Sequence, residues 1–196
     1  LVVIPTDTVY GVAANAFSPE AVQRLLDAKG RGRQSPPPVL IPNADTLAAL
    51  ATEVTEPVRT LAERFWPGPL TIVLTANPSL SWDLGDTGGT VALRIPDHPL
   101  ALDLLRETGP LAVSSANTTG DPAARSDDQA RDMLGESVAV YLDAGPVGSE
   151  EEGFPALPST IVDATRLTNE GGVLRVLRVG ALSRGSIVDA LPQVTL

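Results

Sequence analysis

Short apolar runs alternate with amphipathic stretches along this chain, and this alternation constrains its fold more than any other feature. Between the first two apolar runs, the segment 18–30 has the spacing of an amphipathic helix. Ser18 is its candidate N-cap, Pro19 suits the first helical position, and Gly30 suits the residue after the end. Such alternation is typical of mixed α/β architecture, in which helices pack on strands of mixed pairing.

The same patterns predict the individual elements. We expect strands at 1–4, 37–41, 70–76, 90–96, 110–117, 138–145, 159–165 and 173–180. We expect helices at 18–30, 44–50, 55–66, 97–109, 126–135 and 183–191. Asp97 and Ser126 are the candidate caps of two of these helices. The stretch 145–158 is predicted to be a loop whose three consecutive glutamates lie on the surface.

Composition excludes several classes of function. The chain has 196 residues and an apolar fraction of 43%, which suit one domain with a substantial core. No apolar run has the length that spans a bilayer or a signal-peptide core needs, so we expect a cytoplasmic protein without a membrane partner. The absence of cysteine excludes disulfides, thiolate zinc sites and a cysteine nucleophile. The single histidine, His98, excludes multi-histidine metal sites, and its place between two prolines favours a structural role.

The charge balance argues against a nucleic-acid partner. With 24 acidic against 14 basic residues, the formal net charge is -10. An acidic protein repels nucleic-acid backbones unless its basic residues are concentrated in one place. One such concentration exists, at Lys29, Arg31 and Arg33 of "KGRGR". It is short and lies beside apolar sequence, so it indicates an anion pocket, and we expect direct nucleic-acid binding to be weak or absent.

Three predicted strands carry small polar residues at one end. Thr6, Asp7 and Thr8 follow the first strand, "SSANTT" ends the strand at 110–117, and Ser159 begins another. Small hydroxyl and amide groups supply donors and acceptors and let a ligand approach the backbone. They are also favoured in turns, where they bond their own backbone. Three such ends beside a basic cluster favour a polar ligand pocket.

The basic residues indicate the charge of that ligand. Glycines separate Lys29, Arg31 and Arg33, and arginine forks match phosphate or carboxylate groups. Arg94 and Arg178 stand at the ends of two further apolar runs, where an arginine is either an ordinary edge residue or an anion clamp. The chain contains neither a Walker sequence nor G-x-G-x-x-G. The residues alone therefore predict a site for a small anionic ligand, with the reaction unspecified.

Five segments in order, "PTDTVYG", "KGR", "SSANTTG", "PSTIVD" and "LRVG", resemble the Sua5/YrdC/YwlC family over residues 1 to about 185. Members are L-threonylcarbamoyladenylate synthases. The resemblance implies a single-domain, twisted open mixed sheet with flanking helices and a concave, positively charged cavity. It also implies one YrdC-like domain over residues 1–196, of the short type, without the roughly twenty residues that relatives carry before "PTDTVYG".

The resemblance further implies a reaction. L-threonine, bicarbonate or CO2, and ATP give threonylcarbamoyl-AMP and pyrophosphate, as the first step toward the t6A modification of tRNA. ATP is a substrate, and Mg2+ is expected with it. A threonylcarbamoyl-transferase complex is the expected downstream partner. The reaction needs no nucleophilic side chain, so catalysis would be positioning and electrostatic stabilisation.

Roles for individual residues also follow from the resemblance. Threonine is expected to be bound by Thr6, Arg94 and Ser159. The nucleotide is expected to be bound by Lys29, Arg31, Arg33, Thr90, Ser115, Asn117 and Arg178. Lys29 and Arg31 are the predicted catalytic residues, and Thr6 to Tyr10 are expected to face the substrate.

One departure leaves alternatives open. Ala123 stands where many family members have a serine, so one hydrogen bond to ATP is expected to be missing. A YciO-like paralogue without this activity is therefore an alternative. The resemblance implies a second alternative, an RNA-binding protein of the same fold, against which the net charge of -10 argues. A carbamoyl-transfer domain of the hydrogenase-maturation type is a third, and the lack of attached zinc-finger and acylphosphatase-like segments argues against it.

Overall fold

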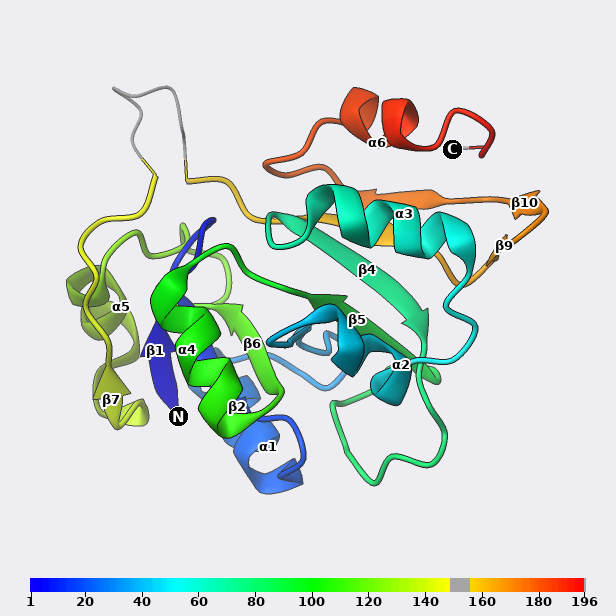
Figure 1. Cartoon of the computed structure of the whole chain (residues 1–196). Coiled ribbons are helices and arrows are strands. Elements are labelled where there is room, and N and C mark those ends of the chain that lie inside the picture. The colour runs from blue at the N-terminus through cyan, green and yellow to red at the C-terminus, as the bar shows by residue number, and fades with distance from the viewer. Residues whose placement is uncertain (149–155, 196) are drawn as a thin grey trace.

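The computed structural model describes residues 1–148 and 156–195 and contains a nine-stranded mixed sheet covered by helices (Figure 1). The order of its strands is β11-β8-β4-β5-β3-β6-β2-β1-β7. Their bounds are β1 Val2–Ile4, β2 Gly11–Asn15, β3 Val39–Leu40, β4 Leu70–Thr75, β5 Thr90–Arg94, β6 Leu111–Ser115, β7 Val140–Tyr141, β8 Thr160–Asp163 and β11 Arg175–Arg178. A separate hairpin pairs β9 Leu167–Thr168 with β10 Gly171–Gly172.

Six α-helices lie in the described part of the chain. They are α1 Pro19–Ala28, α2 Leu47–Leu50, α3 Glu56–Phe65, α4 Pro99–Thr108, α5 Asp127–Leu134 and α6 Arg184–Ala190. Two short 3-10 turns, Ala44–Thr46 and Gly135–Ser137, adjoin α2 and α5. The expected helices are therefore confirmed, and none of them is displaced by more than a few residues. The glutamates of the predicted 145–158 loop lie outside the described residues.

Strand pairing confirms the predicted mixed sheet. β4 with β5 and β2 with β6 are antiparallel, whereas β3 with β5 and β4 with β8 are parallel. The pattern missed β2, because Gly11–Asn15 is a run of small residues without alternating polarity. It also overextended the strand at 138–145, since only Val140–Tyr141 pairs with β1.

Helix caps follow local chemistry. The Ser18 and Ser126 hydroxyls accept hydrogen bonds from the N–H groups of Ala21 and Gln129, as predicted. The prediction that Asp97 caps α4 is wrong: the helix starts at Pro99, and residue 98 occupies the cap position without a side-chain bond. The N–H of Asp97 instead donates to the Asp7 carboxylate at 2.9 Å, which ties this segment to the turn after β1.

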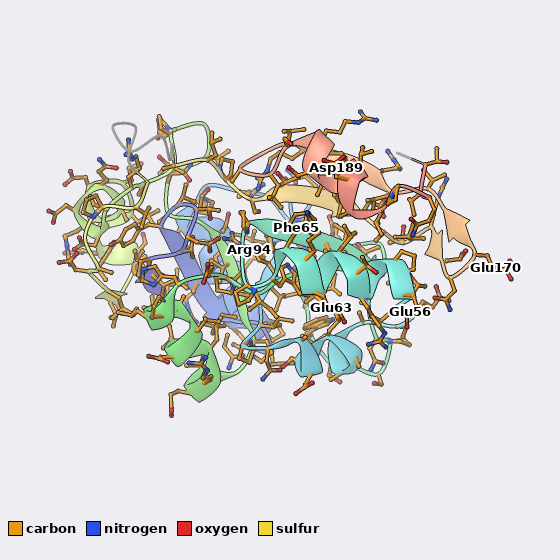
Figure 2. All side chains as sticks on the ribbon, turned by 45° about the horizontal axis from the view of Figure 1, so that its top comes forward. Glu56, Glu63, Phe65, Arg94, Glu170 and Asp189 are labelled. Carbon is orange, nitrogen blue, oxygen red and sulfur yellow. The ribbon has the colours of Figure 1, made fainter. Side chains whose placement is uncertain are left out.

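Hydrophobic packing leaves one sheet face free for the site. Around β1, β2 and β6, α4 covers one face, and α1 and α5 cover the other. Around β4, β5 and β8, α3 and α6 pack on one face through Leu61 and Ile187, and the opposite face lines a cavity. Acidic side chains such as Glu56, Glu63 and Asp189 point outward, whereas Arg94 lies inside the molecule (Figure 2).

Candidate ligand-binding site

A cavity of about 600 Å3 lies on the open face of β4, β5 and β8. Alternate strand residues form its floor, because successive side chains of a strand point to opposite faces. They are Thr71 and Val73 of β4, Thr90, Ala92 and Arg94 of β5, and Ile161 of β8. A volume of this size is typical of small-molecule sites.

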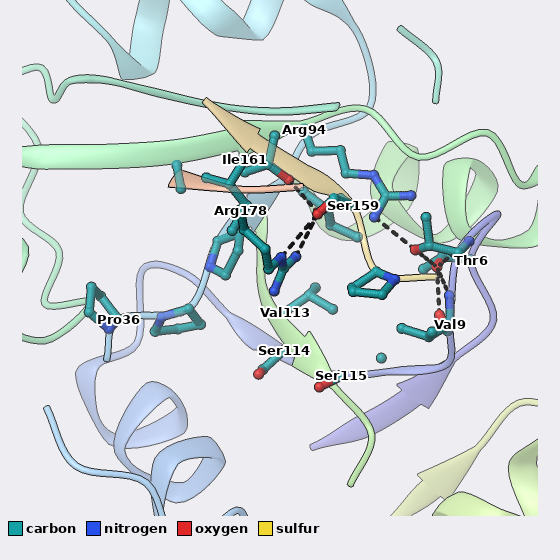
Figure 3. Close-up of a pocket in the computed structure, with 18 of the residues that line it drawn as sticks. Thr6, Val9, Pro36, Arg94, Val113, Ser114, Ser115, Ser159, Ile161 and Arg178 are labelled. Atoms are coloured by element: carbon teal, nitrogen blue, oxygen red, sulfur yellow. Dashed lines mark hydrogen bonds between the residues drawn. The ribbon is translucent and has the colours of Figure 1, made fainter. Parts of the chain in front are cut away.

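Loops from distant parts of the sequence form the remaining walls. The turn between β1 and β2, the proline run 36–38, the segment after β6, the segment before β8 and the end of β11 all line the cavity (Figure 3). Gly180, just after β11, allows two of these segments to meet. A Cβ at this position would lie 2.0 Å from the Pro158 carbonyl oxygen, so glycine is required for the approach.

Eight of the ten residues predicted from the sequence line this cavity. They are Thr6, Arg31, Thr90, Arg94, Ser115, Asn117, Ser159 and Arg178. Lys29 and Arg33 are not among the lining residues. The sheet therefore brings together side chains that are up to 172 residues apart, the separation of Thr6 and Arg178.

Thr6 organises the turn between β1 and β2. Its hydroxyl lies 2.5 Å from the Val9 carbonyl oxygen and accepts from the N–H groups of Thr8 and Val9, at 3.2 Å each. Thr6 is 3% exposed, so these bonds satisfy a buried polar group. Thr6 is thus a turn residue that bonds its own backbone, which was one of the two expected roles. Thr6 also lines the cavity.

Arg94 is a buried cation held by three acceptors. Its Nη2 lies 2.5 Å from Asp7 Oδ1, its Nη1 donates to Thr8 Oγ1 at 3.0 Å, and its Nε donates to the Gly68 carbonyl at 2.9 Å. Burial lowers the pKa of Arg94, and the neighbouring Asp7 carboxylate opposes that shift. Asp7 therefore compensates the charge and fixes the direction of the guanidinium.

Arg178 and Ser159 form a second polar unit that lines the cavity. Arg178 donates to the Ser159 carbonyl from Nε and Nη2, at 3.1 and 2.8 Å, and Nη2 lies 3.2 Å from Ser159 Oγ (Figure 3). Ser159 Oγ lies 2.8 Å from Thr71 Oγ1. One hydrogen-bond network thus joins β4 of the cavity floor, the residue before β8 and the end of β11.

Lys29 binds a loop of the cavity without lining it. Its ammonium donates to the carbonyl oxygens of Ser115 and Asn117, the latter at 2.5 Å. The Lys29 carbonyl accepts from the Thr119 N–H at 3.0 Å. Burial lowers the pKa of Lys29 from 10.5 to about 8, with a smaller contribution from the charge of Arg31. Lys29 therefore fixes the loop that presents Ser115 and Asn117.

Arg33 lies outside the cavity. Its Nη2 is 2.7 Å from Asp83 Oδ1, and its side chain is 45% exposed. Hydrogen bonding to Asp83 raises the pKa of Arg33. Of the two arginines in "KGRGR", only Arg31 turns inward. The glycine spacing of the segment gave no sign of this difference between Arg31 and Arg33.

The cavity is electropositive within an acidic protein. Arg31, Arg94 and Arg178 all line it. Burial lowers the pKa of Arg178, and the positive charges of Arg94 and Arg31 add to that effect. Three guanidinium groups that repel one another in a partly buried space favour an anionic ligand.

Sequence reasoning missed several lining residues and placed two wrongly. Thr71 and Asp121 line the cavity although the sequence analysis did not name them, whereas Thr8 and Ser114 lie in polar strand ends that it did name. A polar residue inside the apolar run of β4 was the available signal for Thr71. Tyr10 was expected to face the substrate, but it is 0% exposed and donates to the Gly145 carbonyl at 2.7 Å. Asp7 likewise turns toward Arg94 and is not a lining residue.

The fold and this arginine-lined cavity define a class of small α/β protein with a cationic cavity on an open sheet face. Residues 1–180 match the model of the Sua5/YciO/YrdC family, which carries the description "Telomere recombination". The chain belongs to this family. No helix among the described residues is long and apolar enough to cross a membrane.

Individual proteins and solved structures are also similar to this chain. A Mycobacterium tuberculosis protein, provisionally named a threonylcarbamoyl-AMP synthase, is 51% identical over 97% of this chain and 83% of its own length. The Pyrococcus abyssi Sua5 structure with L-threonine matches all of this chain at 35% identity with a TM-score of 0.87, and this chain spans 54% of that one. Escherichia coli YciO matches 96% of this chain and 85% of its own at a TM-score of 0.77, but at 21% identity that likeness shows the fold alone.

Proposed function

We propose that this chain is a threonylcarbamoyl-AMP synthase. The observation that carries the proposal is the convergence of Arg31, Arg94 and Arg178 with hydroxyl groups around one cavity of about 600 Å3. The cations suit a triphosphate and a carboxylate, and the hydroxyls suit a small polar amino acid. Identity of 51% with the mycobacterial relative supports the assignment.

Within the cavity, the residues divide into two proposed groups. The resemblance to the family assigns Thr6, Arg94 and Ser159 to the threonine side, and all three line the cavity. The nucleotide side comprises Arg31, Thr90, Ser115, Asn117 and Arg178. Lys29 supports that side from behind, through the carbonyls of Ser115 and Asn117.

The proposed chemistry forms one C–N bond and one P–O bond. The threonine nitrogen adds to CO2, supplied by bicarbonate, and loses a proton to give a carbamate. A carbamate oxygen then attacks the α-phosphorus of ATP, and the bond to pyrophosphate breaks. Fixed guanidinium groups stabilise the charge that develops on the phosphoryl oxygens, and the cavity walls hold the reactants in line.

Mg2+ fits this site only as an ion that arrives with ATP. Among the described residues, no group of three histidine, cysteine or acidic side chains could hold a metal. Asp121 is the single acidic side chain among the described lining residues. Mg2+ is commonly bound by one or two carboxylates together with substrate phosphates, so Asp121 would hold it. The ion would neutralise charge on the triphosphate.

Pyrophosphate release tests the proposal. The purified chain is incubated with ATP, L-threonine and bicarbonate, and each substrate is omitted in turn. We expect release only when all three are present. A YciO-like paralogue without the activity would release none, and release that is independent of threonine would indicate ATP hydrolysis instead.

An RNA-binding role receives less support. Three of the arginines face inward on the cavity, where a duplex backbone does not reach, and the net charge is -10. A salt-dependent gel shift at low ionic strength would identify such binding. The cytoplasmic location and the downstream transferase complex stay predictions.

A further inference from the structure

A cluster of surface charges joins two loops that flank the cavity. Arg33 Nη2 lies 2.7 Å from Asp83 Oδ1, and Arg33 Nε lies 3.6 Å from Asp86 Oδ1. The Asp86 N–H also donates to the Arg33 carbonyl at 2.8 Å. Gly85 has a φ of +102°, and a Cβ there would lie 2.7 Å from the same carbonyl oxygen. Side-chain and backbone contacts therefore fix the two loops together, and we name this contact the Arg33 clamp.

The Arg33 clamp holds residues that stand next to cavity residues in the sequence. Arg31 lines the cavity, and its Nη1 lies 3.1 Å from Ser114 Oγ. On the β4–β5 loop, Leu84 follows Asp83 and Thr87 follows Asp86, and both line the cavity. A displacement of the clamp would therefore move both walls.

The β4–β5 loop has hollow space on two sides. A second cavity of about 460 Å3 lies beside the first, and Leu84 and Thr87 line both. A segment between two hollows has fewer packing partners to fix its position. Leu84 anchors the middle of the loop in the core, with Leu80 and Trp82 packed against that core. The Arg33 clamp and the stacked rings of Phe17 and Trp82, whose centroids lie 5.6 Å apart, hold the loop from the surface.

We propose that Asp83 and Asp86, acting through Arg33, are positioning residues that hold Arg31, Leu84 and Thr87 against the nucleotide. This inference rests on the proposed function for the identity of the ligand. Arg33 then acts from outside the cavity and does not contact phosphate. The hydrogen bond from Arg33, with one from the Gly85 N–H, lowers the pKa of Asp83, so its carboxylate is charged at neutral pH.

The test uses a double variant in which both Asp83→Asn and Asp86→Asn are made. The single variant Asp103→Asn is its control. The control breaks an ion pair of similar length, 2.6 Å to Arg106, on the exposed side of α4. Amide hydrogen exchange is followed in residues 30–35 and 77–89, and KM is measured for ATP and for threonine. We expect faster exchange in both loops of the double variant. We also expect a rise of about two- to fivefold in KM for ATP, the factor that an exposed ion pair carries.

The same experiment shows whether Arg33 positions the loops or contacts phosphate directly. With the double variant, kcat and the KM for threonine should stay as in the wild type, and the control should change nothing. The exchanged pair Arg33→Asp with Asp83→Arg should recover slow exchange and part of the ATP affinity. Unchanged loops and unchanged KM in the double variant would overturn the inference. So would an Arg33→Ala variant that loses ATP affinity while the double variant keeps it.

Failure of the proposed function would be recognised separately. If the wild-type chain made no adenylate, hydrogen exchange and calorimetric binding of ATP would still decide the role of the Arg33 clamp. If the wild-type chain made the adenylate and the double variant matched it in exchange and in KM, only the positioning role would be rejected.

Discussion

The ammonium group of Lys29 lies 2.5 Å from the carbonyl oxygen of Asn117, and this contact joins the "KGR" and "SSAN" segments. A second bond runs from the same ammonium to the Ser115 carbonyl. The two segments are therefore one structural unit rather than two separate ligand-binding motifs. Arg31, Ser115 and Asn117 of that unit all line the cavity.

Replacement of Lys29 by methionine should remove this unit. The buried Asn117 carbonyl would lose the ammonium donor, whereas the Ser115 carbonyl would keep the Asn117 N–H at 2.9 Å. A buried group left unsatisfied costs about 1–3 kcal/mol. We expect a lower free energy of unfolding in urea and loss of pyrophosphate release. An Arg24→Met variant, on the exposed side of α1, is the matched control and should keep both properties. Wild-type rates in Lys29→Met would refute the role of Lys29.

The titration of Lys29 is directly measurable because the chain contains one lysine. Carbon-13 label at lysine Cε therefore reports this residue alone. We expect a midpoint near 8 rather than the usual 10.5, since burial disfavours the charged form. Between these pH values, the unfolded chain binds a proton that the folded chain does not. The contribution of Lys29 to the free energy of unfolding should therefore rise with pH over that window, and the rise should vanish in Lys29→Met. A midpoint near 10.5 would contradict the buried position.

Asp7 should stabilise the fold chiefly by compensating Arg94. The side chains are 14% and 7% exposed, so removal of the carboxylate leaves a buried charge without a partner. Asp7→Asn should lower the free energy of unfolding by about 3–5 kcal/mol. In a double-mutant cycle, Asp7→Asn with Arg94→Met should cost clearly less than the sum of the single changes. Additive costs would mean that the pair is not coupled.

Thr6 should affect threonine more than ATP. Thr6→Ala removes the hydroxyl that holds the turn between β1 and β2, so the wall at the threonine side loses its shape. We expect KM for threonine to rise by about tenfold, as for the loss of one to two hydrogen bonds, with a smaller change for ATP. Thr6→Ser keeps the hydroxyl and should stay close to the wild type. Equal rises for both substrates would argue against this placement.

Ala123 offers a gain-of-affinity test. Ala123 lines the cavity, and the resemblance places a serine at this position in many relatives. Ala123→Ser should lower KM for ATP by about two- to tenfold through one added hydrogen bond, with KM for threonine unchanged as the internal control. No change for ATP would mean that the nucleotide does not reach this wall.

Much of the fold was predictable because the decisive signals are local. An apolar run, a capping serine such as Ser18 or Ser126, or a proline at a helix start affects only the few residues around it. The corresponding strands and helices are where the patterns place them. The strand order was not predictable from these signals, since it depends on pairings such as β3 with β6 that join distant segments. β2 was not predicted because a strand of small residues shows no alternation of apolar and polar side chains.

The sequence predicted which residues form the site better than it predicted where their side chains point. Small polar strand ends and glycine-spaced cations indicated a pocket, and most of those residues do line one cavity. The inward or outward direction of each side chain depends on partners elsewhere in the chain. Asp83 holds Arg33 outside, and the carbonyls of Ser115 and Asn117 hold Lys29 behind the wall. No periodicity within "KGRGR" contains that information.

The most direct measurement is mass spectrometry of the product made with carbon-13 bicarbonate. The chain is incubated with ATP, L-threonine and the labelled bicarbonate, and the nucleotide products are separated. We predict an adenylate with the mass of threonylcarbamoyl-AMP that carries one carbon-13 atom and appears together with pyrophosphate. AMP or ADP without any labelled adenylate would contradict the proposed function.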